Sequence, residues 1–423
     1  MMKATLKGKK LLVLAGGANL VTLVERAKKL GVYTIVTDYY DEEKSPAKKI
    51  ADEAWNISWS NIDELEQKCR DVGVNGITTG YSESPVESCI ELCRRLSLPC
   101  YCTKEQLDFT RDKVKFKEVC RSVGVPTVKE YKSIDEVDDF PVIVKPVDRA
   151  GSIGVGIAMN MQELQKAYDY AMQMSYCKNV IIEKYINGTK IDVYYEIRNG
   201  KISLLTTDSV INAKNNGYKR VIQSAWYFPS HEHDLIVEKT DKVLKKMIKY
   251  LGIKNGYMFI SGFVLGSEIV FFESGFRLCG GHLYNYLEEL GFANNMDIFI
   301  YHALTGSTKG VKVGRKGNRN LKCINVNVYA KKGIIKSIEG VDAIKEIDDC
   351  KFALTTGRIG QECEDDKAIL SKIGMFYFCN EDAKKLKEDI EEAYSLLKVS
   401  DLDGDDMIYD RIETENVDKL WKK

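Results

Sequence analysis

The stretch from Lys145 to Gly156 reads KPVDRAGSIGVG and follows the apolar residues Pro141–Val144. Its last six residues contain three glycines and one serine. Glycines let a loop turn its backbone N–H groups into one concavity that suits phosphate oxygens, and a nearby ammonium adds positive charge. No Lys-Ser or Lys-Thr pair follows, so this is not a Walker A sequence. We expect a phosphate-binding loop between two strands; for the loop alone, a flexible hairpin beside an incidental lysine is the alternative.

Two apolar strand pairs follow this loop along the chain. Ile191–Ile197 and Ile202–Thr207 are separated by a turn at Asn199-Gly200, which predicts a β-hairpin. A second hairpin is expected from Tyr257 to Glu273 through Gly266-Ser267, and it ends in FFESGFR. Glu273 at that strand end can hold Mg²⁺, and Arg277 can contact a phosphate or a carboxylate. Taken alone, the motif favours a surface salt pair across a turn.

The first hundred residues alternate between strand and helix patterns. Strands are expected at Lys10–Ala15, Val32–Thr37 and Val74–Thr79, with helices between them, which predicts a parallel sheet with crossover helices. Asp38 lies about twenty residues after Gly16-Gly17, as in dinucleotide-binding folds. The glycines do not form a full GxGxxG, and a double glycine is more often the tight turn that such a unit needs. A dinucleotide oxidoreductase is therefore the least favoured interpretation.

Composition excludes several classes of protein. The chain has 423 residues, which indicates two to three domains, and 62 basic residues balance 62 acidic ones. This balance does not favour nucleic acid or an anionic membrane surface as a partner. No apolar run approaches the roughly 20 residues that span a bilayer, so we expect a cytoplasmic protein. Twelve cysteines without a CxxC pair and four scattered histidines predict reduced, partly buried thiols rather than a zinc site.

Four motifs in this order resemble the ATP-grasp superfamily, in its biotin-carboxylase-like and amino-acid-ligase-like branch. They are FTRDKVKFKEVCRSVGVPTVKEY, KPVDRAGSIGVG, IIEKYI and FFESGFR. The resemblance implies an α/β fold in three parts. Residues 1–106 would form an N-terminal pre-ATP-grasp, Rossmann-like domain. Residues 107–310 would form the ATP-binding lobes, with a lid at about 112–182, and residues 311–423 a strand-rich C-terminal domain.

The same resemblance implies roles for individual residues. The nucleotide phosphates would be bound by Lys113 and Lys145, and the loop with Gly151, Ser152 and Gly154 would close over the γ-phosphate. Adenine would meet Glu183, Lys184 and Ile186, and Asp192 would meet the ribose hydroxyls. Glu273 would bind Mg²⁺, and Arg277 would steady the transferred phosphoryl group or the acyl phosphate. Glu83 and His282 are further candidates for substrate contact.

Two positions depart from the family pattern. The family usually has a metal-binding carboxylate on the strand before Glu273, and the alignment puts Ser261 there. It also often has Glu-x-Asn-x-Arg, where this chain has Gly275 in place of the asparagine. Either Mg²⁺ is held by Glu273, ATP oxygens and water, or another carboxylate substitutes.

The resemblance implies an enzyme that uses ATP and Mg²⁺. An ADP-forming carboxylate–amine ligase is expected, which makes an acyl phosphate from an amino acid or another small carboxylate and passes the acyl group to an amine. A homodimer is also implied by the branch. The alternative is an ATP-binding homologue that has lost catalysis and serves as a sensor or partner protein, and the serine at position 261 motivates it.

Overall fold

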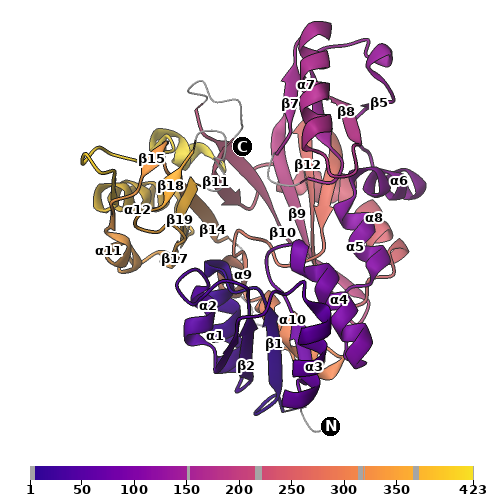
Figure 1. The fold of residues 1–423 in the computed structure, drawn as a ribbon. Coiled ribbons are helices and arrows are strands. Elements are labelled where there is room, and N and C mark those ends of the chain that lie inside the picture. The colour runs from indigo at the N-terminus through magenta and orange to yellow at the C-terminus, as the bar shows by residue number, and fades with distance from the viewer. Residues whose placement is uncertain are drawn as a thin grey trace.

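The computed structural model describes residues 5–149, 153–214, 222–312, 318, 320–364 and 371–422. Figure 1 shows three lobes: an N-terminal lobe, a lid that carries α7, and a C-terminal lobe. The mixed α/β architecture expected from the sequence is confirmed. Within the described residues, none of the helices has the length and apolar character that a bilayer crossing requires.

The N-terminal lobe is a parallel sheet with strand order β3-β2-β1-β4. Its strands are β1 (Lys10–Leu14), β2 (Tyr33–Thr37), β3 (Glu53–Trp55) and β4 (Gly76–Thr78). Leu12 lies opposite Ile35 on one side and Ile77 on the other, and all three side chains are buried. Helices cover the sheet; they are α1 (Val21–Lys29), α2 (Pro46–Ile50), α3 (Ile62–Val72) and α4 (Ser84–Leu96). The predicted parallel sheet is therefore present.

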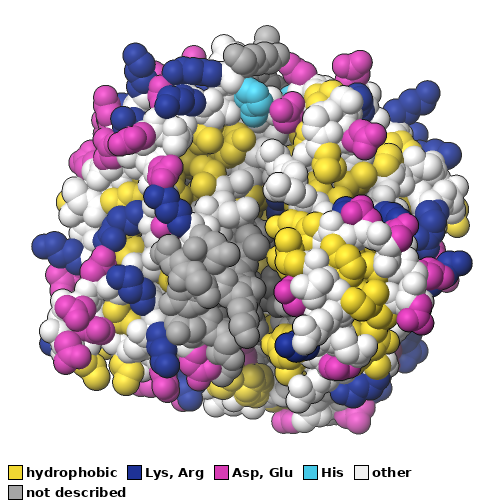
Figure 2. Space-filling view, turned by 90° about the horizontal axis from the view of Figure 1, so that it is seen from above, with side chains coloured by type: hydrophobic (Ala, Val, Ile, Leu, Met, Phe, Trp, Pro, Cys, Tyr) yellow, Lys and Arg dark blue, Asp and Glu magenta, His cyan; other side chains and the backbone are white. Residues whose placement is uncertain are grey.

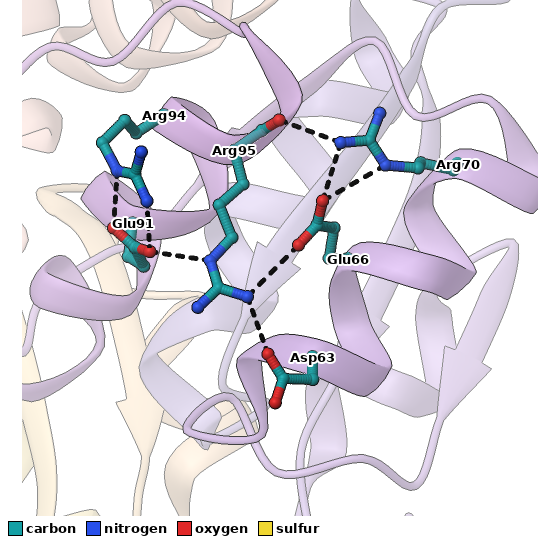
Figure 3. A network of polar contacts seen from close by, with 6 residues as sticks. All are labelled: Asp63, Glu66, Arg70, Glu91, Arg94 and Arg95. Carbon is teal, nitrogen blue, oxygen red and sulfur yellow. Dashed lines mark hydrogen bonds and ion pairs between the residues drawn. The ribbon is translucent and has the colours of Figure 1, made fainter.

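A charged network joins α3 to α4 (Figure 3). Arg95 Nη1 lies 2.7 Å from Asp63 and 3.2 Å from Glu66, while its Nε lies 2.7 Å from Glu91. Arg70 contacts Glu66 at 2.7 Å and donates to the Arg95 carbonyl at 2.9 Å. Exposed ion pairs of this kind are screened by water and add little to stability. The network therefore orients α4, which begins directly after Glu83, while apolar burial on the other side of the helices supplies most of the stability.

The lid is a four-stranded antiparallel sheet in the order β5-β8-β6-β7, covered by one helix. Its elements are β5 (Glu130–Tyr131), β6 (Val142–Pro146), β7 (Gly156–Ala158), α7 (Met161–Met174) and β8 (Val180–Lys184). Val142 and Val144 of β6 pack with Leu164 and Ala171 of α7 in a small separate core. The glycine-containing loop joins β6 to β7, so it connects two paired strands as predicted.

An eight-stranded sheet runs through the rest of the molecule in the order β13-β12-β9-β10-β11-β14-β19-β17. The strands are β9 (Thr189–Arg198), β10 (Lys201–Asn212), β11 (Gln223–Phe228), β12 (Gly256–Leu265), β13 (Glu268–Gly275), β14 (Lys322–Tyr329), β17 (Cys350–Thr355) and β19 (Lys372–Asn380). Both predicted hairpins are confirmed. Asn199 and Gly200 have φ values of 50° and 78°, as a tight hairpin turn requires.

The sheet and one helix cross the predicted domain boundaries. β11 pairs with β14, so strands on both sides of residue 310 belong to one sheet. Helix α10 (Asn295–Thr305) packs on the N-terminal sheet, where a Cβ built on Gly76 would lie 2.4 Å from the Ala303 carbonyl oxygen. The lobes are thus interleaved along the chain rather than consecutive.

The sequence pattern of Thr110–Val123 predicts one helix that ends at Gly124, but the structure divides this segment between two helices. α5 (Lys104–Arg111) and α6 (Lys113–Val123) are separated by Asp112, which has ψ of 117°. The Asp112 carboxylate accepts hydrogen bonds from the amides of Val114 and Lys115, so it caps α6 and starts a new helix there. This break makes Lys113 the first residue of α6.

Further helices and short strands complete the C-terminal half. They are α8 (His233–Tyr250), α9 (Tyr284–Glu289), β15 (Gly333–Ile334), β16 (Ser337–Glu339), α11 (Val341–Lys345), β18 (Glu362–Cys363), α12 (Ala383–Leu396) and β20 (Lys398–Ser400). Figure 2 views the molecule from the lid end. Acidic and basic side chains are interspersed over the described part of this face, and the surface is hollowed beside the residues drawn in grey.

Candidate active site

Lys113 and Lys145, the two lysines predicted to contact phosphates, come to one cleft. Lys113 begins α6, and Lys145 lies near the end of β6. Burial lowers the pKa of the Lys113 ammonium, with Glu273 acting to raise it and Lys145 to lower it. Charges shift the pKa of a neighbour only at short range, so Lys113, Lys145 and Glu273 lie close together. The Lys113 ammonium also donates a hydrogen bond of 2.9 Å to the Arg149 carbonyl, where the glycine-containing loop begins.

Glu183 lies between two buried lysines. Its carboxylate is 2.6 Å from Lys145 Nζ and forms a second ion pair with Lys117, a residue that sequence analysis missed. Burial acts to raise the pKa of Glu183, but Lys145 and Lys117 outweigh it and the pKa falls below its ordinary value. The predicted adenine contact of this side chain stays a prediction. In the structure its observed role is to hold Lys145 in place.

The other hinge residues follow Glu183 at the end of β8. The Lys184 ammonium lies 2.6 Å from Asp139 and donates to the Phe140 carbonyl at 3.2 Å, so its side chain is tied to the lid. Ile186 is partly exposed beyond the strand end. A hinge contact to adenine would therefore use the backbone of Lys184 and the apolar side chain of Ile186, and this assignment remains untested.

The phosphate loop is described only in part. Gly151 and Ser152, which were predicted to cover the γ-phosphate, lie outside the described residues. Gly154 has φ of +76°, and a Cβ there would lie 2.7 Å from both Pro146 and Met174. Only glycine fits this packed, left-handed position. The far end of the loop is therefore held against β6 and α7.

Arg277 connects the sheet to the N-terminal lobe. Its Nε lies 3.3 Å from the carboxylate of Glu83, the residue before α4, and its guanidinium lies 5.2 Å from the centre of the Phe259 ring. The structure thus places two predicted site residues, Glu83 and Arg277, side by side at the cleft. The pairing gives Arg277 a fixed direction, which suits a group that steadies a developing negative charge.

A row of polar residues crosses the floor formed by β13, β12, β9 and β10. Glu273 lies opposite Ser261, Ser261 opposite Asp192, and Asp192 opposite Asp208. Ser261 donates a hydrogen bond to the Asp192 carboxylate. Asp208 accepts from the Asp192 amide at 2.8 Å and from the Tyr194 hydroxyl at 2.6 Å. Directly opposed residues project to the same side of a sheet, so these side chains share one face.

Lys190 is a further site residue that sequence analysis missed. It precedes Asp192 by two positions on β9 and therefore shares its face. Burial acts to lower the pKa of Lys190, but the nearby carboxylates of Asp192 and Glu273 outweigh it and raise the pKa. An alternation of charged and apolar residues in TKIDVYYEIR was the available signal. The floor thus carries one ammonium among three carboxylates.

The departure at Gly275 has a physical explanation. A Cβ built on Gly275 would lie 2.3 Å from the Phe259 ring, which lies on the neighbouring strand directly opposite. The ring occupies the space that a side chain at position 275 would need. Position 275 cannot supply a ligand in this arrangement, which leaves Glu273 and the β9 carboxylate to face the cleft.

His282 is a packed residue that joins two lobes. It is fully buried, with its ring centroid 4.5 Å from that of Tyr81 and 5.2 Å from that of Phe352. One ring nitrogen contacts Asn19 at 3.2 Å and the other contacts the Tyr284 hydroxyl at 3.4 Å. Burial lowers the pKa of His282 to about 3. A neutral ring with both nitrogens engaged does not support the predicted substrate contact.

Lys372 is a further cationic residue near His282 that was not predicted. Its ammonium is 5.6 Å from the centre of the Trp226 ring. Burial lowers its pKa to about 7, and the nearby Cys279 acts in the opposite direction. Lys372 is thus a cationic side chain close to Cys279, which follows Arg277 by two residues.

The Asp38 carboxylate forms its hydrogen bonds within the N-terminal lobe. It accepts hydrogen bonds from the Gly16 amide at 2.8 Å and the Tyr40 amide at 3.2 Å. The glycine turn is thus closed by the acid that a dinucleotide fold would offer to a ribose. This contact supports the interpretation of Gly16-Gly17 as a tight turn.

Three thiols cluster where helix α4 packs against the segment that follows it. The Sγ atoms of Cys89, Cys93 and Cys100 all lie within 4.8 Å of one another, and the twelve cysteines are free. Cys89 and Cys93 belong to an apolar core with Ile77 and Leu92, against which Cys100 packs. The expectation of reduced, partly buried thiols agrees with this environment. Their proximity was missed because only the fold returns Cys100 to the helix.

The donor set on the sheet floor fits Mg²⁺. This ion prefers carboxylate and other hard oxygen ligands, often from only one or two side chains together with phosphates and water. Glu273 and Asp192 place two carboxylates on either side of the Ser261 hydroxyl. The chemistry of these groups therefore suits the metal that the resemblance implies.

Comparison with known proteins agrees with this geometry. A family model described as D-ala D-ala ligase C-terminus matches residues 112–254. D-alanine–D-alanine ligase of Fusobacterium nucleatum is 29% identical over 169 residues, 39% of this chain and 55% of that protein. The chain thus aligns with only about half the length of that relative.

Solved structures match over almost the whole chain. The biotin carboxylase domain of 2-oxoglutarate carboxylase from Hydrogenobacter thermophilus, solved with MgADP and bicarbonate, gives a TM-score of 0.76 at 19% identity and covers 98% of this chain and 93% of its own. The L-amino acid ligase of Bacillus licheniformis gives a TM-score of 0.75 at 16% identity and covers 93% of this chain and 99% of its own.

The lid, the eight-stranded sheet and the parallel-sheet lobe together form the ATP-grasp fold that these solved structures share. The chain's family-model match and its structural neighbours fall within the ATP-grasp carboxylate–amine ligases. Relatives of this kind use ATP with Mg²⁺.

Proposed function

We propose that this chain is an ADP-forming carboxylate–amine ligase that activates an amino acid or another small carboxylate as an acyl phosphate. The observation that supports this proposal best is the meeting of Lys113, Lys145 and Glu273 at one cleft beneath the lid. Two ammonium groups suit the triphosphate, and a strand-end carboxylate suits its metal ion. Arg277, tied to Glu83, stands beside them.

The nucleotide would lie between the lid and the eight-stranded sheet. Lys113 and Lys145 would hold phosphate oxygens, and the loop between β6 and β7 would close over the γ-phosphate. Lys184 and Ile186 would hold adenine, and Asp192 is the sequence-based candidate for the ribose. When bound, Mg²⁺ would be held by Glu273 and would supply positive charge that neutralises the phosphate oxygens. Glu183 keeps the Lys145 ammonium in position throughout.

The reaction would proceed in two steps. A carboxylate oxygen attacks the γ-phosphorus, the bond between that phosphorus and the β–γ bridging oxygen breaks, and ADP leaves. An amine nitrogen then attacks the acyl carbon, the bond from that carbon to the phosphate oxygen breaks, inorganic phosphate leaves, and the nitrogen gives up a proton. Arg277 would steady the negative charge of the transferred group. A closed lid would keep water from the acyl phosphate.

The part of the cleft near Arg277 and Cys279 favours an anionic substrate. Arg277 and Lys372 both lie close to Cys279, and Lys372 contacts an aromatic ring rather than a carboxylate in the part of the chain that is described. A substrate carboxylate would give Lys372 a counter-charge and would add a second anion beside Arg277, which already pairs with Glu83. The acid partner of the reaction would therefore bind near Lys372 and Arg277 before it is phosphorylated.

ADP release in the presence of ATP, Mg²⁺ and a panel of amino acids, small carboxylates and amines tests the proposal. We expect release that depends on one carboxylate and one amine. Lys113→Ala should lower turnover strongly, whereas Lys115→Ala should not, because Lys115 pairs with Asp108 outside the cleft at 3.3 Å. Nucleotide hydrolysis that no carboxylate stimulates would contradict the proposal.

Ser261 and Gly275 favour a second candidate, an ATP-binding protein without ligase activity. Calorimetric binding of ATP with Mg²⁺ decides between the two when it is combined with Glu273→Ala. Tight binding without turnover in the native protein, and no change of turnover in the variant, would favour the second candidate.

A further inference from the structure

The metal-binding positions of this cleft are rearranged relative to the family pattern, and the structure indicates which side chain compensates. Position 261 carries a hydroxyl in place of a carboxylate, and the Phe259 ring closes position 275. Both changes lie on the β12–β13 hairpin, and both remove oxygen ligands from it. Glu273 is the carboxylate that remains on that hairpin at the strand end.

Strand β9, which pairs with β12, carries a carboxylate directly opposite position 261. Asp192 on β9 is directly opposite Ser261 on β12, and Ser261 is directly opposite Glu273 on β13. Side chains opposite one another in an antiparallel sheet have Cβ atoms about 4.5–5.5 Å apart and point to the same side. Asp192 and Glu273 therefore flank Ser261 on the cleft face.

The hydrogen bond from Ser261 brings the Asp192 carboxylate toward the hairpin. The hydroxyl donates to Oδ1 of Asp192, so this oxygen lies against the side chain at position 261. A carboxylate on residue 261 itself would occupy the same neighbourhood.

The surroundings hold Asp192 in this orientation. Asp208 accepts a hydrogen bond of 2.8 Å from the Asp192 amide and is itself bound by the Tyr194 hydroxyl, so its carboxylate is committed to the sheet. The Tyr257 hydroxyl, which is fully buried near Asp192 and Asp208, has no hydrogen-bond partner among the described residues. This donor could serve an oxygen ligand bound at the floor.

We infer that Asp192 supplies the second carboxylate to the divalent cation that accompanies ATP, and that it does so through the space left by the small side chain of Ser261. The inference rests on the proposed function and replaces a ribose role for Asp192. Glu273 provides the first carboxylate. Lys190, two residues before Asp192, balances the charge of the pair and keeps the floor from carrying an uncompensated excess of negative charge.

Mn²⁺ binding measured by electron paramagnetic resonance, with a non-hydrolysable ATP analogue present, tests the inference. Asp192→Asn should weaken Mn²⁺ binding by about tenfold, the range seen when a partner of a metal site is lost. Its affinity for the analogue in EDTA should stay at the native value. Glu268→Gln, on the exposed start of β13, is the matched control and should leave both affinities unchanged.

A swap of side chains keeps the test decisive when Asp192→Asn folds poorly. The double variant Asp192→Ser, Ser261→Asp moves the carboxylate to the adjacent strand and should regain Mn²⁺ binding to within about threefold of native protein. Native Mn²⁺ affinity in a folded Asp192→Asn protein would overturn the inference. Loss of analogue binding in EDTA would overturn it too, because that loss indicates a ribose contact. Native protein that takes up no nucleotide would instead contradict the proposed function.

Discussion

The Lys145 ammonium lies 2.6 Å from the Glu183 carboxylate, and the two residues are only 7% and 1% exposed. Lys117, which is fully buried, pairs with the same carboxylate from the other side. One buried anion thus holds two buried cations. The phosphate-binding role proposed for Lys145 depends on this pairing, because an isolated buried ammonium would lose its charge or move.

Glu183→Gln should destabilise the protein by about 3–5 kcal/mol, because the change leaves two buried ammonium groups without their anion. Urea denaturation at pH 7 measures the effect. Glu130→Gln is the matched control, since Glu130 meets Lys117 at 3.6 Å from a partly exposed position and should cost far less. Equal midpoints for the two variants would contradict the prediction.

Acid should also weaken the protein through Glu183. Its folded pKa is lowered below the ordinary value of 4.5, because Lys145 and Lys117 outweigh the burial that would raise it. The stabilisation is therefore complete above pH 4.5 and is lost as the pH falls through the lowered pKa. Native protein should lose stability more steeply than Glu183→Gln below pH 4.5, as followed by circular dichroism. Parallel pH profiles would show that the carboxylate makes no such contribution.

Gly275→Ala should destabilise the protein by about 1–3 kcal/mol, the usual cost of overpacking. The added Cβ would lie 2.3 Å from the Phe259 ring. Chemical denaturation of Gly275→Ala, Phe259→Ala and the double variant gives the coupling between the two positions. The double variant should lose less than the sum of the single changes. Gly17→Ala is the control, because no atom lies within 4 Å of a Cβ at that position.

Lys372→Met should stabilise the protein most at and below pH 7. Burial lowers the folded pKa of Lys372 to about 7, whereas the ordinary value is 10.5. The unfolded chain binds more protons between these two values, so native stability rises with pH across that window and the cost of burying the charge is complete below it. Thermal melts from pH 6 to about 10 should show this slope in native protein and a smaller one in the variant. Lys331→Met, at an exposed site, should keep the native slope.

His282→Asn should lower stability and remove part of its pH dependence. The substitution keeps the left-handed backbone, where His282 has φ of 55°, because asparagine adopts it readily. It removes a ring that stacks between Tyr81 and Phe352. Burial lowers the folded pKa of His282 to about 3 from 6.5, so native stability falls as the pH drops between these values. Denaturation across that range should be flatter in the variant than in His231→Gln.

Local patterns predicted most of the elements that build the cleft. The Asn-Gly and Gly-Ser turns gave both hairpins of the sheet floor, since the backbone angles of such turns depend on those residues alone. The strand–loop–strand unit around Lys145 and the parallel N-terminal sheet were also predicted correctly. The helix predicted at 110–123 ends at Gly124 as expected, but its start was wrong, because nothing in the sequence showed that the Asp112 carboxylate caps a new helix.

Pairings between distant residues could not be predicted. Lys117 meets Glu183 across 66 positions, and Ser261 meets Asp192 across 69. Nothing near Lys117 in the chain marks it as a site residue, and the alternation around Lys190 does not show which carboxylates it meets. His282 and Lys372 likewise acquire their shifted pKa values from side chains that the fold brings to them.

The sequence by itself determined the kind of fold, the order of its parts and the charged residues at the strand ends, because hydrophobic periodicity, turn residues and motif order are local properties. Tertiary structure alone decided how the charges combine. Strand register placed Asp192 beside Ser261, and packing put the Phe259 ring over Gly275. Buried charged residues were brought next to their partners in the same way. These effects depend on which strands lie side by side, and local sequence does not show that.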